Sequence, residues 1–249
     1  MIKITADLIC PVSAPALTNG VLILEDSGKI LAIEKMADHD TTSVKKHQGV
    51  LVPGFVNTHC HLELSHMKGK VDTGTSLIPF ITNVVKFRDV PQEQIDAAIV
   101  AGDREMYEAG IVAVGDISNK TDTAAVKNES RIRYYTFVEM FDFIQDAMAQ
   151  QEYDKYHQVY EAQAGAGGNR KSCVPHAPYT VSPTLFELIN KANQKKATTQ
   201  TISIHNQETP PEDQLFQKKA GAFLDFYGGF NISLDAFEPT GQSSIHYAM

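Results

Sequence analysis

The stretch LVPGFVNTHCHLELSHMKG (residues 51–69) places His59 and His61 at the end of a short apolar run. The run reads as a β-strand, with Pro53 best tolerated near its start. In a strand, residues i and i+2 face the same side, roughly 7 Å apart, so the two imidazoles point together and Cys60 points away. Two imidazoles at that spacing can converge on one ion at metal–nitrogen distances of about 2.1 Å. The stretch therefore predicts a strand that ends in part of a metal site.

After this stretch, strand-like runs alternate with helical sequence. The expected strands cover 110–118, 131–140, 171–179 and 201–208, and the expected helices cover 76–88, 91–109, 121–130, 143–164, 182–196 and 209–228. The helix starts rest on Pro91, on Ser182 as a cap, and on a capping box formed by Thr209 and Glu212. This alternation predicts an α/β fold with a parallel sheet and about five β/α units.

Residues 1–50 follow a different pattern. Runs such as VLILE and ILAIEK are β-formers, and EDSGK between them is a hairpin signal. We therefore expect two domains: a small β segment over 1–50 and a β/α domain over 51–249.

The composition excludes several classes of function. A net charge of −8 without a basic stripe argues against a nucleic-acid surface. The sequence contains neither an apolar run of membrane-spanning length nor a signal-peptide pattern. Cys10, Cys60 and Cys173 are far apart and form no CxxC pair, which excludes a cysteine zinc knuckle and suits the reducing cytoplasm.

Histidines end three of the expected strands, where parallel α/β folds carry their active sites. They are His59, His61, His176 and His205. A lone histidine at a strand end is usually structural, but four at one edge indicate a metal site. We predict His59, His61 and His205 as ligands and place His66 in a substrate pocket. The remaining histidines, expected on the solvated surface, are His39, His47, His157 and His246.

Two carboxylates compete for the role of general acid/base. Glu208 follows His205 by three residues in HNQE, and a carboxylate beside a metal-activated water can accept its proton. The alternative is that Glu208 only provides a favourable negative charge at the start of a helix. Glu63, in HLE, imitates the H-x-E of nucleobase deaminases, but the P-C-x-x-C of that family is missing. We therefore favour Glu208 and expect Glu63 to be a substrate-pocket or structural residue.

Three motifs resemble one known family. PGFVNTHCHLE, VPHAPYTVSP and SIHNQET, in this order and spacing, resemble the metal-dependent amidohydrolase superfamily, and the lead-in ADLICPVSAPALTNGVLILEDSGKILAIEK is similar to its β-sandwich segment. The deaminase branch is the nearest match. It includes guanine, S-adenosylhomocysteine, aminofutalosine and cytosine deaminases and the triazine chlorohydrolases.

The resemblance implies a (β/α)8 TIM barrel preceded by a small β-sandwich segment. It implies His59, His61 and His205 as metal ligands, Glu208 as the catalytic acid/base, and His176 as a catalytic residue that contacts substrate. The fourth strand, CVPHAPY, has no bridging lysine, which implies one divalent metal. Zinc suits an N/O donor set best, with iron as the alternative.

The chain departs from the family pattern after the fifth strand. The family continues with a sixth-strand histidine and an eighth-strand aspartate, and too few residues follow here for three more β/α units. We expect an N-terminal part of the pattern, which would leave the barrel incomplete and open.

For the intact protein, the resemblance implies hydrolytic deamination of an amino-substituted heterocycle by a cytoplasmic enzyme, with a small-molecule substrate and a homodimer as further expectations. Three alternatives stay open: hydrolytic dechlorination, hydrolysis of another cyclic C–N bond, and an inactive truncated remnant.

Overall fold

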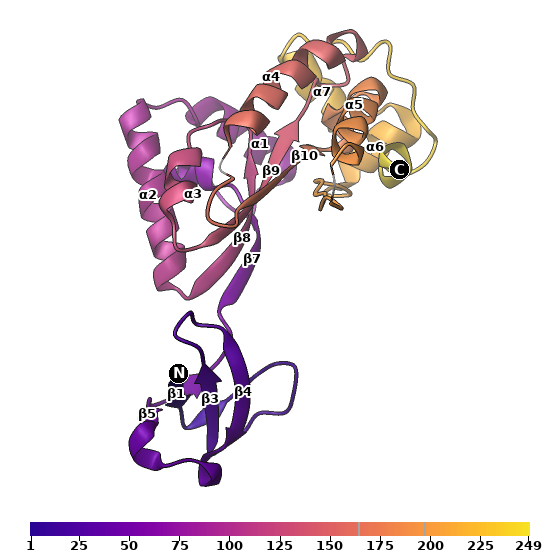
Figure 1. The fold of residues 1–249 in the computed structure, drawn as a ribbon. Coiled ribbons are helices and arrows are strands. Elements are labelled where there is room, and N and C mark those ends of the chain that lie inside the picture. The colour runs from indigo at the N-terminus through magenta and orange to yellow at the C-terminus, as the bar shows by residue number, and fades with distance from the viewer. Residues whose placement is uncertain (164, 197) are drawn as a thin grey trace. The chain divides into compact units, whose positions relative to one another are not determined.

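The computed structural model describes residues 1–163, 165–196 and 198–249. The chain forms two compact units, Met1–Phe55 and Val56–Met249, each described here by itself (Figure 1). The sequence interpretation placed the division between residues 50 and 51, a few residues earlier.

The first unit is built of short strands. Its described residues form a sheet in the order β4-β3-β1-β5 and a two-stranded pair, β2-β6. The strands are β1 Ile2–Thr5, β2 Leu8–Ile9, β3 Gly20–Leu24, β4 Ile30–Lys35, β5 Lys45–Lys46 and β6 Val50–Leu51, with 3₁₀ helices at Met36–Asp38 and Thr41–Ser43. The predicted hairpin is confirmed, because β3 and β4 pair antiparallel and Gly28 takes the positive φ that the turn needs. A sandwich packing of these sheets stays a prediction.

The second unit contains a sheet that, among the described residues, runs in the order β10-β9-β8-β7. Its strands are β7 Phe55–Cys60, β8 Ile111–Ser118, β9 Arg133–Met140 and β10 Arg170–Pro175. β8 pairs parallel with β9, and β9 pairs parallel with β10, so the predicted parallel α/β architecture is confirmed in this part. A closed barrel stays a prediction.

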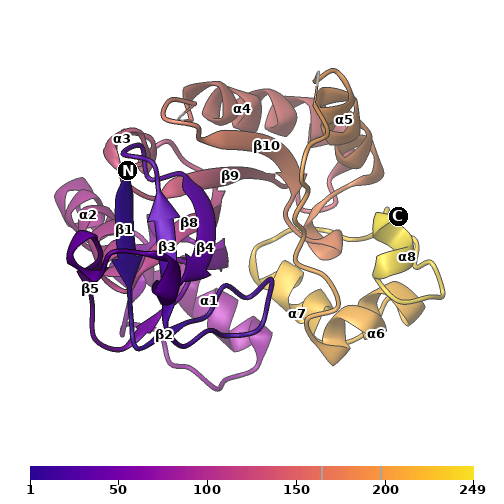
Figure 2. The ribbon, with the colours of Figure 1, turned by 60° about the horizontal axis from the view of Figure 1, so that its bottom comes forward.

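The helices of the second unit pack partly against this sheet and partly against one another. They are α1 Leu77–Phe87, α2 Gln92–Glu108, α3 Ala124–Glu129, α4 Ala149–Ala162, α5 Pro183–Gln194, α6 Pro210–Lys218, α7 Ala222–Gly229 and α8 Ile245–Ala248, with 3₁₀ helices at Leu62–Met67, Asp146–Met148 and Pro178–Thr180. α4 and α5 lie beside β10 in both views (Figures 1 and 2). Ser182 caps α5 as predicted, because its hydroxyl accepts the Leu185 N–H.

Side chains of β9 alternate between the two faces of the sheet. Val138 and Met140 pack with α4 and α5 in one core cluster. Phe137, on the opposite face, forms a separate cluster with Ile117 and Val174. Residue 139 shares the face of Phe137 because the side-chain period of a strand is two.

The predicted strand at 201–208 is wrong. No strand is assigned within these described residues, although the segment follows β10 through isolated contacts. The His205 N–H donates to the His176 carbonyl at 2.9 Å, and the Ser172 hydroxyl donates to the Thr201 carbonyl at 2.7 Å. A ladder of backbone bonds is needed for a strand, and these two contacts do not make one.

Three smaller predictions also need correction. The helix expected from 143 begins at Ala149, because Phe143 and Ile144 take positive φ. The helix expected over 209–228 breaks at Lys219, which is left-handed. Thr209 is the N-cap there but makes no side-chain cap bond, and the Glu212 carboxylate instead accepts the N–H groups of residues 207 and 208.

Among the predicted surface histidines, His39 is the exception. Its side chain is only 7% exposed and lies 3.0 Å from the Glu34 carboxylate. His47 and His246 are exposed, and the His157 side chain is about a third exposed. None of the helices in the described ranges is both long and apolar enough to cross a membrane.

Candidate metal centre

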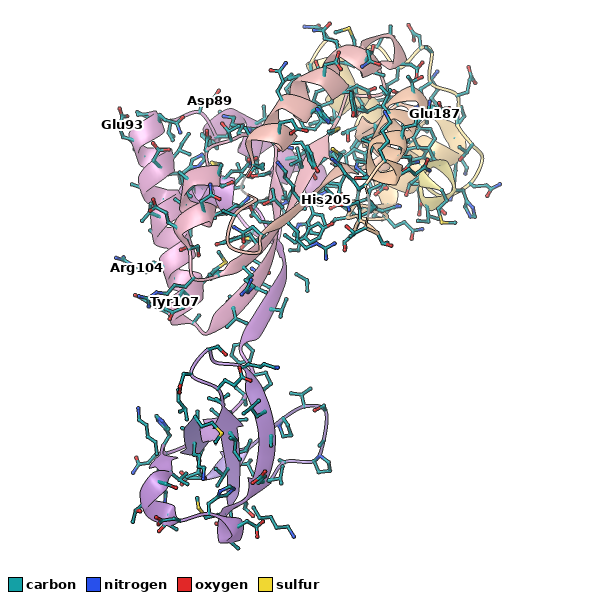
Figure 3. All side chains as sticks on the ribbon, viewed as in Figure 1. Asp89, Glu93, Arg104, Tyr107, Glu187 and His205 are labelled. Carbon is teal, nitrogen blue, oxygen red and sulfur yellow. The ribbon has the colours of Figure 1, made fainter. Side chains whose placement is uncertain are left out.

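Three imidazoles meet where β7 ends. His59 lies on β7, His61 follows directly after it, and His205 lies on the segment beside β10 (Figure 3). Their ring centroids are 4.9–5.4 Å apart. One nitrogen of each ring lies within 4.8 Å of the others. The structure thus brings together the three residues that the sequence predicted as ligands.

The surroundings of His205 determine which ring nitrogen is free. Its Nδ1 lies 3.1 Å from Glu139 Oε1 and 3.3 Å from the His176 carbonyl oxygen. A carbonyl oxygen and a carboxylate only accept hydrogen bonds, so Nδ1 is the protonated nitrogen. Nε2 is consequently left with a lone pair for a metal.

The two histidines of the HxH motif carry little positive charge at neutral pH. Burial lowers the pKa of His61 to about 4. Burial, and then the charge of His205, lower the pKa of His59. For His205, burial would lower the pKa, but the hydrogen bond and charge of Glu139 raise it. Metals bind neutral imidazole, so the lowered pKa values of His59 and His61 suit a divalent cation.

A second group of metal-capable side chains lies beside the first. In the described part of the chain, Glu139, His176 and His205 also offer ligand atoms within 4.8 Å of one another. Burial would raise the pKa of Glu139, but the charges of His176, His205 and His61 lower it to about 2. Glu139 is therefore a buried anion at neutral pH, and it shares His205 with the first group.

The two predicted catalytic side chains, Glu208 and His176, each make a hydrogen bond to a neighbouring hydroxyl group. The Tyr179 hydroxyl donates to Glu208 Oε2 at 2.6 Å, and the residue is otherwise exposed. His176 Nδ1 lies 2.7 Å from the Thr180 hydroxyl, which donates to the Ala177 carbonyl. Thr180 must then accept from Nδ1, which leaves His176 Nε2 as an acceptor. The ring of His176 lies 5.2 Å from that of His205.

Glu63 and His66 lie on the 3₁₀ helix after β7, and both are buried. Glu63 Oε2 accepts the backbone N–H groups of Asn119 and Lys120, at 2.9 and 3.1 Å. His66 Nε2 lies 2.9 Å from the Arg88 carbonyl oxygen. Neither belongs to the two metal-capable groups found among the described residues. Their substrate-binding role stays a prediction.

Sequence reasoning missed the buried charges around the site. Asp116, on β8, accepts the Leu62 N–H at 2.8 Å and pairs with Lys127 at 2.6 Å, with both side chains fully buried. Glu139 lies within β9, and Asn119 follows β8 directly. A usable signal exists, because Asp116 and Glu139 are single charges inside the apolar runs IVAVGDIS and YYTFVEM.

Comparison with known proteins is consistent with this geometry. The chain is 26% identical to a 5′-deoxyadenosine deaminase of Methanococcus maripaludis over 84% of this chain and 51% of that protein. It superposes on aminofutalosine deaminase of Helicobacter pylori with a TM-score of 0.75 and 21% identity, covering 98% of this chain and 59% of the other. It also superposes on an atrazine chlorohydrolase of Arthrobacter aurescens complexed with zinc, with a TM-score of 0.69 and 14% identity, covering 100% of this chain and 57% of the other.

The two structural matches concern the fold, and the chain spans about half the length of the curated relatives it matches. The family model decides membership, since it matches most of the chain, including both HxH histidines and His205. With residues 50–232 matched, the chain belongs to the amidohydrolase family.

Proposed function

We propose that the protein is a metal-dependent hydrolase that deaminates an amino-substituted purine, with one zinc ion held by His59, His61 and His205. The observation that carries the proposal is the convergence of these imidazoles within 4.8 Å at the end of β7. Three nitrogen ligands that leave a further position open are typical of catalytic zinc. The zinc named with the similar chlorohydrolase structure supports this choice of metal.

When bound, the metal supplies Lewis-acid activation of the attacking water. Glu208 would accept a proton from that water as the water oxygen adds to the ring carbon bearing the amine, and would deliver this proton to the ring nitrogen. The second proton of the water then passes to the amine, so that the carbon–nitrogen bond breaks and ammonia leaves. The Tyr179 hydroxyl fixes one oxygen of this carboxylate, at 2.6 Å, and leaves the other free for proton transfer. His176 orients the substrate by accepting a hydrogen bond at Nε2.

The substrate class is a 6-aminopurine nucleoside. Support comes from the 5′-deoxyadenosine deaminase relative, which shares 26% identity over 84% of this chain. Dechlorination differs only in the leaving group and rests on a likeness of fold, so we place it second. A cytoplasmic location and a homodimer stay predictions.

The test measures both the metal bound by the protein and the product that it releases. Metal binding is measured on the 249-residue chain, and turnover on the native protein with 5′-deoxyadenosine, adenosine, guanine and a chlorotriazine. We expect one zinc per chain, ammonia from the adenosine compounds and no chloride. His61→Ala should lose the metal, whereas His47→Ala, an exposed histidine of the first unit, should keep it. Equal zinc binding by these two variants, or chloride release without ammonia, would contradict the proposal.

A further inference from the structure

Glu139 occupies the position from which a side chain can control His205. It is the penultimate residue of β9, and its side chain is 3% exposed on the face opposite the helices. Oε1 lies 3.1 Å from His205 Nδ1. The contact joins β9 to a segment that has few backbone bonds of its own, so it determines where the imidazole lies.

The other oxygen of Glu139 is fixed independently. Oε2 accepts from the side-chain amide of Asn119 at 3.1 Å, and the same amide donates to the Glu139 carbonyl at 3.1 Å. The backbone N–H of Asn119 is in turn held by Glu63 at 2.9 Å. The carboxylate is therefore oriented from the loop after β8 before it meets His205, as a preorganised partner must be.

The alternative is a second metal on Glu139, His176 and His205. Both metal-capable groups contain His205, and a neutral imidazole has only one lone-pair nitrogen to give. Two metals would need His205 as a bridging imidazolate, with Nδ1 stripped of its proton. The acceptors around Nδ1, at 3.1 and 3.3 Å, instead favour the protonated nitrogen. The two groups therefore cannot both bind a metal through His205. We favour the first group because it offers three ring nitrogens.

We propose that Glu139 is the positioning residue of this metal centre: its carboxylate accepts the Nδ1 proton of His205 and directs Nε2 to the metal. A carboxylate–histidine–metal arrangement fixes the tautomer and ring orientation and increases the basicity of the ligand. The inference rests on the proposed function, because it assigns Glu139 a role only if His205 binds the metal. It also gives Glu63 a role, as the residue that fixes Asn119.

The test compares zinc affinity among variants of the 249-residue chain, by competition with a chromophoric chelator. Glu139→Leu removes the acceptor and should weaken zinc binding about 10–100-fold. Glu139→Gln keeps an acceptor oxygen without the charge, so we expect a smaller loss and partial rescue. The control is Asp103→Asn, a carboxylate that accepts from Ser130 and Tyr134 and contacts no histidine in the described structure. It should leave the affinity unchanged.

A spectroscopic measurement separates positioning from a structural role. In the zinc-loaded wild type, ¹⁵N NMR should detect a slowly exchanging Nδ1 proton on His205, and this proton should exchange quickly in Glu139→Leu. If Glu139→Leu does not fold, Glu139→Gln decides by the same two measurements. Wild-type affinity in the Glu139 variants, or a second zinc lost with Glu139, would overturn the role of Glu139 alone. A wild-type chain that binds no zinc would overturn the proposed function and, with it, this inference.

Discussion

Replacing Lys127 by methionine should strongly destabilise the second unit. Lys127, on α3, pairs with Asp116 at 2.6 Å, and neither side chain is exposed. The ammonium also donates to Thr136 at 3.0 Å. The change therefore leaves a carboxylate and a hydroxyl buried with fewer partners.

The expected loss follows from the geometry. Coulomb's law at 2.6 Å with an effective dielectric of 20 gives an attraction of about 6 kcal/mol. The cost of burying two ions offsets much of this, but removing one partner leaves the other charge uncompensated, which costs about 3–5 kcal/mol. For a unit of this size, that loss corresponds to a thermal midpoint lower by roughly 6–20 °C.

Thermal unfolding followed by far-UV circular dichroism measures the change. The matched control is Lys155→Met, which breaks a surface pair with Glu152 at 2.9 Å where Lys155 is 61% exposed. It should cost at most about 1 kcal/mol. The double variant with Asp116→Asn should recover part of the loss, since no unpaired charge then remains. Equal effects of Lys127→Met and Lys155→Met would refute the reasoning.

Three further predictions concern the site and its sheet. Glu208→Gln should retain zinc while kcat falls about 10²–10⁴-fold, as measured by ammonia release and metal analysis. Burial raises the pKa of Glu63 from 4.5 to about 7. The protonated carboxyl therefore stabilises the fold fully below about pH 4.5, and this stabilisation is lost as the pH rises to about 7. Urea titrations should show the free energy of unfolding falling by about 3 kcal/mol over this range, and Glu63→Gln should not show this fall. Gly115→Ala would place a methyl 2.7 Å from the Thr58 carbonyl oxygen and should cost about 1–3 kcal/mol, whereas Gly228→Ala meets nothing within 4 Å and should not lower the thermal midpoint.

Much of the fold could be predicted because its signals are local. The hairpin between β3 and β4 follows from the turn residues, and the Ser182 cap follows from one side chain and one N–H. The three parallel strands β8, β9 and β10 follow from apolar runs separated by helical sequence. In each case the information lies within about ten residues, which is the range that pattern reasoning covers.

The remainder depends on contacts between distant segments. The segment 201–205 has strand-like composition, but its structure is decided by the few bonds it makes to β10. Phe143 and Ile144 take a left-handed backbone that non-glycine residues rarely adopt, so their sequence gives no warning. The histidines were identifiable because their spacing is a motif. Glu139 could be recognised from the sequence only as a buried charge, because its role depends on a histidine far along the chain.

The charges around the imidazoles explain why these residues belong to one centre. Glu139 is buried and anionic, and its pKa of about 2 keeps it so throughout the neutral range. A buried anion needs a compensating positive charge nearby. His59 and His61 supply little of it, because their pKa values are lowered. The side-chain partners of Glu139 include the Asn119 amide and the Nδ1 proton of His205, and behind that ring the lone pair of Nε2 faces the other two imidazoles. A divalent cation bound there would polarise the hydrogen-bonded proton toward Glu139 through the ring. By accepting the Nδ1 proton, the Glu139 carboxylate therefore makes Nε2 of His205 a stronger metal ligand.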